Sequence, residues 1–126
     1  MNTLITDTGF TPDDWNFEGA NDHTLDLASD VDPMTVTFDS TEMIRVDFPN
    51  FADGRGFTIA RQLRLRGYTG RLRAKGHVIA DQYAMARRVG FDEVEIDAAL
   101  AQRQLEADWR ARADWQAGDY QARLRG

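Results

Sequence analysis

The chain contains no cysteine, and this absence removes several classes of chemistry at once. Disulfides, thiolate nucleophiles, iron–sulfur clusters and cysteine-ligated zinc are all excluded. A redox role would need a bound flavin or nicotinamide, or a partner that carries the cofactor. We predict no cofactor. We also predict no metal site, because the only histidines, His23 and His77, are far apart and belong to no compact ligand motif.

Long apolar runs are also missing. No stretch of about 18 apolar residues occurs, so no membrane-spanning helix is expected. Residues 1–7 lack the basic and apolar regions of a secretory signal. These observations predict a cytoplasmic protein with no membrane partner.

What is present is typical of one globular domain. The 126 residues are 42% hydrophobic and 29% charged. We expect a single domain over residues 1–126, with an acidic N-terminal arm at 1–42, an α/β core at 43–117 and a polar tail at 118–126.

The charges are divided unevenly along the chain. Residues 1–53 hold twelve acidic residues and one basic residue, Arg45, whereas residues 54–126 hold fourteen basic and nine acidic residues. Either the two halves pair with each other, or they form a bipolar surface that steers a partner or an anionic ligand.

Hydrophobic periodicity predicts the secondary structure of the core. We expect a short edge strand at 34–38, core strands at 43–48, 70–74 and 94–96, and helices at 57–66, 78–89 and 98–117. Gly67 and Gly90 stand where helix C-caps are expected, and Asp97 where an N-cap is expected. The fold class is therefore α/β: a βαβαβα unit with a short parallel sheet, half-barrel-like or flavodoxin-like, after an irregular arm.

Ligands of parallel α/β folds bind at the carboxyl ends of the strands, which here carry several polar residues. Asp47 and Phe51 lie at or after the first core strand and Asp97 after the third. A candidate anion site at this edge comprises Asp53, Gly54, Arg55, Gly56, Arg73, His77 and Asp81.

Simpler interpretations of these residues stay open. The glycines suit a tight turn in which Asp53 caps the helix, and the spacing matches neither a P-loop nor a dinucleotide fingerprint. His77 and Asp81 are four residues apart on the expected helix, so they could form an imidazole–carboxylate pair. Asp47 could pair structurally with Arg73 on the next strand. The catalytic residues, if any, are not identified.

Residues 54–80 contain seven basic residues and no acidic one. They are either a solvated face that pairs with the acidic arm or a docking patch for an acidic protein. The candidate patch consists of Arg61, Arg64, Arg66 and Arg71. Nucleic acid is not an expected partner, because the chain is acidic, with a pI near 4.8, and carries no recognition motif.

Four segments resemble one bacterial family: residues 46–57, 60–64, 70–82 and 87–92. The first contains the pattern Phe-Pro-x-Phe-x-Asp-Gly-Arg-Gly at 48–56. They resemble a bacterial domain-of-unknown-function family that is labelled "probable oxidoreductase". Its members are commonly encoded beside assimilatory sulfite reductase and phosphoadenylylsulfate reductase. The resemblance covers residues 44–97 and supplies no catalytic residues.

The resemblance implies a non-catalytic accessory protein of sulfite reduction that binds sulfite reductase or another sulfur-assimilation protein and is not itself redox-active. One alternative is a small enzyme or anion-binding module with its site at the strand carboxyl ends. Another is a structural subunit with no ligand, a homo-oligomer that uses its long C-terminal helix as the contact; an exposed Trp109–Trp115 stripe would support it.

Overall fold

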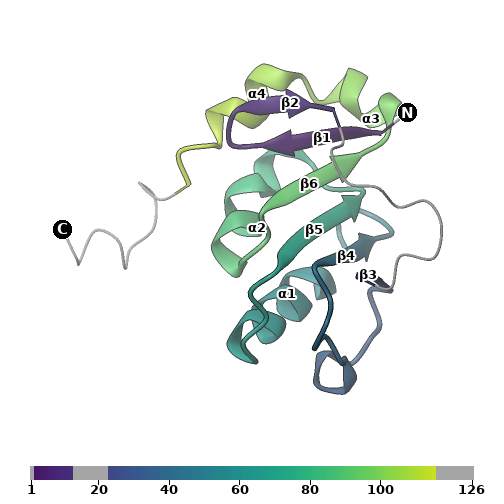
Figure 1. The fold of residues 1–126 in the computed structure, drawn as a ribbon. Helices are drawn as coiled ribbons and strands as arrows, with labels where there is room; N and C mark the ends of the chain where they lie inside the picture. The colour runs from purple at the N-terminus through teal and green to yellow at the C-terminus, as the bar shows by residue number, and fades with distance from the viewer. Residues whose placement is uncertain (1, 13–22, 116–126) are drawn as a thin grey trace.

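The computed structural model describes residues 2–12 and 23–115 and forms a twisted six-stranded sheet with helices on one side (Figure 1). The elements in chain order are β1 (Thr3–Thr6), β2 (Gly9–Thr11), β3 (Thr24–Leu27), the 3₁₀ turn η1 (Pro33–Thr35), β4 (Met43–Phe48), α1 (Arg55–Leu65), β5 (Arg71–Gly76), the 3₁₀ turn η2 (Ala80–Gln82), α2 (Tyr83–Val89), β6 (Glu93–Ile96), α3 (Ala98–Arg103) and α4 (Glu106–Ala111).

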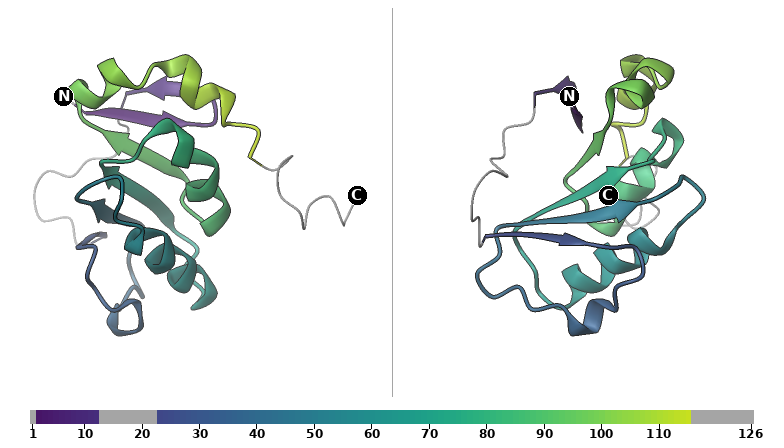
Figure 2. Two further views of the ribbon diagram at one scale, coloured as in Figure 1. Left: turned by 180° about the vertical axis from the view of Figure 1, so that it is seen from behind. Right: turned by 90° about the vertical axis from the view of Figure 1, so that its right-hand side faces the viewer.

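The strands lie in the order β2-β1-β6-β5-β4-β3. Strands β3 to β6 are parallel and follow the order of the chain, whereas β1 pairs antiparallel with both β2 and β6. Successive right-handed crossovers in one direction all lie on the same face of a sheet. The edge-on view in Figure 2 shows the result, with the described helices on one side of the sheet.

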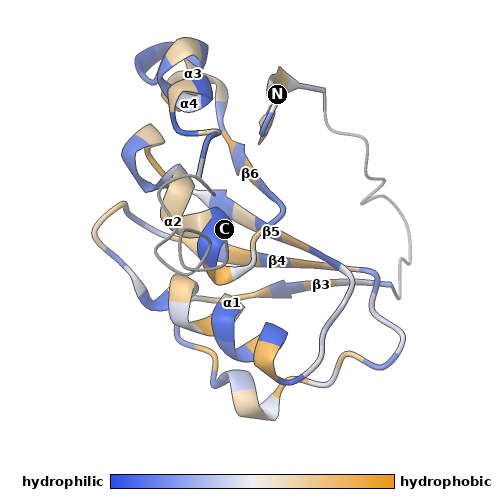
Figure 3. Cartoon of the chain, turned by 90° about the vertical axis from the view of Figure 1, so that its left-hand side faces the viewer, coloured by the Kyte–Doolittle hydropathy of each residue, from blue (hydrophilic) through white to orange (hydrophobic). Residues whose placement is uncertain are grey.

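The face of the sheet toward the helices is apolar. Side chains at alternate strand positions are buried there, and hydropathy alternates along the strands in Figure 3. Phe48 packs against Phe57 of α1 and against Phe91, with ring centroids 5.1 and 5.8 Å apart. The sheet residues of this core are Ile5, Leu27, Ile44, Val46, Phe48, Leu72, Ala74, Val94 and Ile96.

The opposite face carries a chain of buried and half-buried ion pairs. Arg73 at its centre is fully buried and donates from Nη1 to Glu95 (2.8 Å) and from Nη2 to Glu93 (3.2 Å). Arg45 extends the chain on one side by bonding both Glu95 and Asp26.

The chain continues on the other side, where Arg71 donates twice to Glu93, at 2.7 and 2.6 Å. Basic and acidic side chains therefore alternate across four strands. We call this arrangement the charge ladder; its members are Asp26, Arg45, Glu95, Arg73, Glu93 and Arg71. Burial alone would raise the pKa of Glu95, but hydrogen bonds from Asn2 and Arg73 and the charges of Arg45 and Arg73 hold it lowered. Glu95 is therefore ionised in the native state.

The predicted α/β class and βαβαβα unit are confirmed. The core strands and α1 lie within two residues of their expected bounds. Gly67 and Gly90 both have positive φ, and Asp97 Oδ1 accepts the Leu100 N–H at 2.8 Å, as expected for caps. The predicted Asp47–Arg73 pair is wrong, because Arg73 is held by the two glutamates while Asp47 lies opposite Lys75 and is exposed.

The N-terminal arm is much more regular than predicted. It contributes β1, β2 and β3; β1 pairs with β6, far away in sequence, and β3 pairs with β4, the next strand along the chain. The hairpin between β1 and β2 turns at Asp7 and Thr8, and Gly9 follows at φ 109°. Thr11 ends β2, and residues 13–22 of the arm lie outside the described part, as does the tail at 118–126.

The predicted strand at 34–38 is wrong. Pro33 sets the first position of η1, and Asp32 accepts the Met34 N–H at 2.9 Å, so the chain turns there instead of extending. Phe38 nevertheless anchors the segment by an edge-on contact with Tyr68, centroids 5.3 Å apart.

Two predicted helices are shorter than expected. The segment at 78–89 starts extended and becomes helical only at η2 and α2. The long helix expected at 98–117 is broken at Gln104, which adopts an extended conformation between α3 and α4. The break lets Trp109 enter the core and donate to the Gln104 carbonyl at 3.0 Å.

The two cap glycines offer a matched test of this packing. An alanine Cβ at Gly90 would lie 2.5 Å from Arg64 Cγ, whereas nothing lies within 4 Å of the same atom at Gly67. Both glycines have positive φ, which costs an L-residue about 1–2 kcal/mol. We predict that Gly90→Ala lowers the free energy of unfolding by at least about 1 kcal/mol more than Gly67→Ala, measured by urea denaturation. Equal losses would contradict the close Arg64–Gly90 contact.

Candidate functional site

The parallel strands β4, β5 and β6 end at one edge of the sheet, which is where ligands bind in α/β proteins. The strands end at Phe48, Gly76 and Ile96, and each is followed by a loop that carries polar residues. Because the crossovers lie on one face, no neighbouring strands diverge to open a crevice. A site at this edge has to be formed by the loops and by α3.

Asp53 and Arg55, expected as the heart of an anion site, bind each other. Arg55 donates from Nε to Asp53 Oδ1 at 2.9 Å and from Nη2 to Oδ2 at 2.7 Å. The Arg55 N–H also donates to Asp53, and Nη2 reaches the Ser29 hydroxyl at 3.0 Å. The side-chain hydrogen bond from Arg55, followed by its backbone N–H, holds the pKa of Asp53 well below its usual range. Gly54 and Gly56 have structural roles in this turn. Gly54 is the N-cap of α1, and Gly56 lies against the Phe48 ring, where a Cβ would clash.

The other three residues of the candidate anion site lie elsewhere. Arg73 belongs to the charge ladder, on the helix-free side of the sheet. Asp81 accepts from Arg112 of the α4 C-cap at 2.7 Å. The predicted His77–Asp81 helical pair is wrong, because His77 lies before η2 and outside any helix. The seven predicted residues therefore do not converge on one point.

His77 instead lines a different cleft at the same edge. It has a volume of about 390 Å³ and is bounded by the β4–α1 turn, the segment after β5 and helix α3. We call it the edge cleft; its lining residues are Phe51, His77, Ile79, Asp97, Leu100, Arg103 and Gln104. Its volume is within the range of small-molecule sites.

Hydrogen bonds fix the walls of the edge cleft to one another. Gln82 Nε2 donates to the Phe51 carbonyl at 2.7 Å, which ties the β4–α1 turn to η2. The Ala80 N–H donates to Gln104 Oε1 at 3.0 Å, which ties η2 to the end of α3. The His77 N–H donates to the Phe48 carbonyl at 2.9 Å. The cleft is therefore built into the fold.

Sequence reasoning found part of this cleft. It placed Phe51, His77 and Asp97 at the correct edge, because each follows a predicted strand. It missed Ile79, Leu100, Arg103 and Gln104. Ile79 was assigned to a helix, and the last three belonged to an unbroken helix whose interruption at Gln104 has no glycine or proline to mark it.

The predicted basic patch is only partly available. Arg64 donates to the carbonyls of Tyr68, Gly70 and Gly90 and to the Asp92 carboxylate, and Arg71 belongs to the charge ladder. Arg66 donates to the carbonyls of Pro33 and Val36, both at 2.7 Å, while its side chain stays at the surface. Arg61 is exposed.

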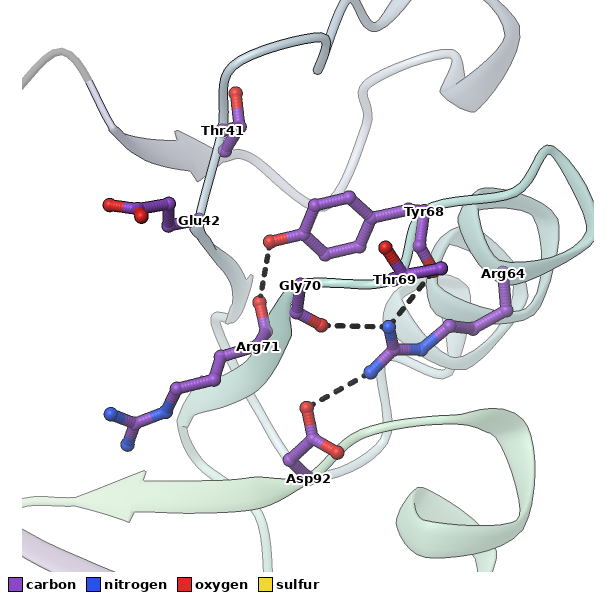
Figure 4. A pocket seen from close by; sticks show the side chains of 8 residues that line it. All are labelled: Thr41, Glu42, Arg64, Tyr68, Thr69, Gly70, Arg71 and Asp92. Carbon is purple, nitrogen blue, oxygen red and sulfur yellow. Dashed lines mark hydrogen bonds and ion pairs between the residues drawn. The ribbon is translucent and has the colours of Figure 1, made fainter.

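Figure 4 shows a second, more open hollow at the amino edge of the sheet, with a volume of about 950 Å³. Arg64 reaches across it to Gly70 and Asp92, and the Tyr68 hydroxyl donates to the Arg71 carbonyl at 2.8 Å. These polar groups are satisfied by the protein itself, so this hollow is structural in character.

The tryptophans do not form the exposed stripe expected for oligomerisation. Trp109 is 1% exposed and packs edge-on against Tyr83. Trp115 is half-buried, with Arg87 stacked 4.8 Å from its ring centroid. Both contacts lie around Asp7, which accepts from Tyr83 and Arg87 and so joins the N-terminal hairpin to α2. Burial, followed by the hydrogen bond to Asp7, raises the pKa of Tyr83 far above its usual value.

Two further findings bear on function. Within residues 2–12 and 23–115, no group of three or more histidine, aspartate or glutamate side chains is placed to hold a metal ion. No helix in this part of the chain combines the length and apolarity needed to cross a bilayer.

Tyr68 provides a pH test of the amino-edge hollow. Burial raises the pKa of Tyr68 to about 12 from an ordinary value of 10.0. The stability linked to this phenol is therefore complete below pH 10 and is lost as the pH rises from about 10 to 12. We predict that Tyr68→Phe costs about 1 kcal/mol at pH 8, through the lost hydrogen bond, and destabilises less or not at all at pH 11.5. Urea denaturation at the two pH values measures both. An equal cost at both would contradict the raised pKa.

Comparison with known proteins agrees with the resemblance in the sequence. A model of the family DUF934, described as bacterial protein of unknown function, matches residues 24–126. No curated protein and no solved structure gave a match. The matched region begins at β3 and includes the parallel strands, the charge ladder and the whole edge cleft. The chain therefore belongs to the DUF934 family of bacterial proteins.

Proposed function

We propose that this protein is a non-catalytic accessory protein of assimilatory sulfite reduction, which acts by binding sulfite reductase or another sulfur-assimilation protein and is not itself redox-active. The proposal draws on the resemblance to a family encoded beside these reductases. It is also supported by the chemistry of the chain, which has no thiol. Asp53 and Arg55, the polar residues expected to act on a ligand, are occupied with each other.

The observation that carries the proposal is an exposed surface on α1 and η1. Leu65 of α1 and Met34 of η1 are large apolar side chains that are 69% and 62% exposed. Arg61 of α1 and Arg66, the C-cap residue of α1, are also exposed. Arg66 joins the two elements by its bond to the Pro33 carbonyl. We call these four residues the docking strip. An apolar centre with arginines beside it is typical of protein interfaces.

The charge of the docking strip favours an acidic partner. Arg66 Nη1 donates to two carbonyl oxygens rather than to a carboxylate, so the positive charge of Arg66 is not neutralised by an ion pair within the described residues. Arg61 forms no ion pair with any residue in the described ranges. Helix α1 carries no acidic residue. Arg64 and Arg71, in contrast, are paired with Asp92 and Glu93, so they would add little to the electrostatic attraction of an acidic partner.

The test is co-elution with the sulfite reductase encoded by the same genome. We expect the two proteins to elute together in size-exclusion chromatography at low salt and to separate progressively at moderate salt, because salt screens exposed charges. The double variant Arg61→Glu/Leu65→Ser should abolish co-elution. Neither side chain makes an internal hydrogen bond in the described structure, so the variant should fold normally.

A matched control is available on α4 and its cap. Leu105 is 61% exposed and Arg110 is exposed, so Arg110→Glu/Leu105→Ser makes the same chemical change away from the docking strip. Co-elution should survive this change. Separate elution at every salt concentration, or equal loss in both double variants, would overturn the proposal.

A further inference from the structure

We infer that the edge cleft is a binding site for a small organic anion, in which an apolar body contacts Phe51, Ile79 and Leu100 and one carboxylate or phosphate-type group is held by Arg103, Gln104 and His77. This site is separate from the docking strip. It differs from the anion site expected from the sequence, with which it shares only His77.

The side-chain donors of the edge cleft have no partner among the described residues, and those of Arg103 and His77 are exposed to solvent. Gln104 Oε1 accepts the Ala80 N–H, and this bond assigns the other end of the amide, Nε2, as a donor. Across the described part of the chain, no hydrogen bond or ion pair engages Gln104 Nε2, the Arg103 guanidinium or the His77 ring. Nine of the other eleven arginines in residues 23–115 bond a carboxylate or a carbonyl, and Arg61 and Arg110 do not. Arg103 is likewise unpaired in this range, and it lines the edge cleft.

The apolar side chains that line the cleft favour a ligand that has an apolar body as well as an anionic group. Ile79 and Leu100 are half-buried, and Phe51 is 59% exposed at the rim. A ligand that covered these three side chains would remove apolar surface from water, which favours binding by about 25 cal/mol for each Å². A bare inorganic ion cannot use this surface. The cleft therefore favours an amphipathic molecule over free sulfate or phosphate.

Asp97 limits where the charge of the ligand can lie. Its carboxylate also lines the cleft, and Oδ1 already accepts the Leu100 N–H at 2.8 Å. The anionic group must therefore lie on the Arg103 side, away from Asp97. Replacing this carboxylate by a neutral side chain that can still cap α3 should tighten binding.

The test is a nuclear magnetic resonance titration of the ¹⁵N-labelled full chain with three naphthalene probes and sulfate. We expect 2-naphthoate or 2-naphthyl phosphate to cause saturable shifts at the amides of 77–80 and 100–104. The tighter of the two identifies the head group. The neutral 2-naphthamide and inorganic sulfate should each bind at least about fivefold more weakly than the tighter probe. The amide lacks the negative charge, and sulfate lacks the apolar body.

Variants connect the binding to the named side chains. Arg103→Gln should weaken the tighter probe at least about fivefold, Asp97→Asn should strengthen it at least about twofold, and the control Arg110→Gln should leave it unchanged. Three outcomes would overturn the inference: no saturable shift with either anionic probe, equal binding of sulfate, or equal binding by Arg103→Gln. None of these bears on the docking strip, so the two proposals fail or succeed independently.

Discussion

The buried guanidinium of Arg73 is the constraint on which the rest of this structure depends. The charge of an arginine with no exposed surface must be balanced internally, and Glu93 and Glu95 of the neighbouring strand do this by accepting from Nη2 and Nη1. These bonds fix β6 beside β5, and Arg45 extends the same chain of charges to β3 through Asp26. Slipping one strand by a single residue would move its charges to the apolar face, so the charge ladder fixes the register of four strands.

Internal bonding, within the charge ladder and elsewhere, makes most arginines of the segment at 54–80 unavailable for function. The acid-free segment at 54–80 appears in the sequence as an open cationic surface, but every arginine in it except Arg61 bonds a carboxylate on β6, before β6 or before α1, or loop carbonyls. Some ion pairs join the two halves, as at Asp53–Arg55 and Asp7–Arg87, while others lie within the second half, as at Arg64–Asp92 and Arg71–Glu93. What remains for partners is small: the docking strip on α1 and η1, and Arg103 in the edge cleft.

The parts of the fold that were predictable are those encoded locally. The alternation at 43–48, the helical periodicity of α1, and the cap residues Gly67, Gly90 and Asp97 all act within a few residues of themselves. Strand β1 was not predictable, because its pairing depends on β6, about 90 residues away in sequence, and β3 was hidden within the acidic arm. The break at Gln104 depends on the buried site of Trp109, and the edge cleft depends on that break.

The most direct test of the central role of Arg73 is the unfolding of Arg73→Met beside the triple variant Arg73→Met/Glu93→Leu/Glu95→Leu, by urea denaturation. The single change leaves two buried carboxylates without their shared partner and should cost about 3–5 kcal/mol. The triple change removes those carboxylates as well and should recover part of that loss. A cost below about 1 kcal/mol for Arg73→Met, or a triple variant less stable than the single, would contradict the account.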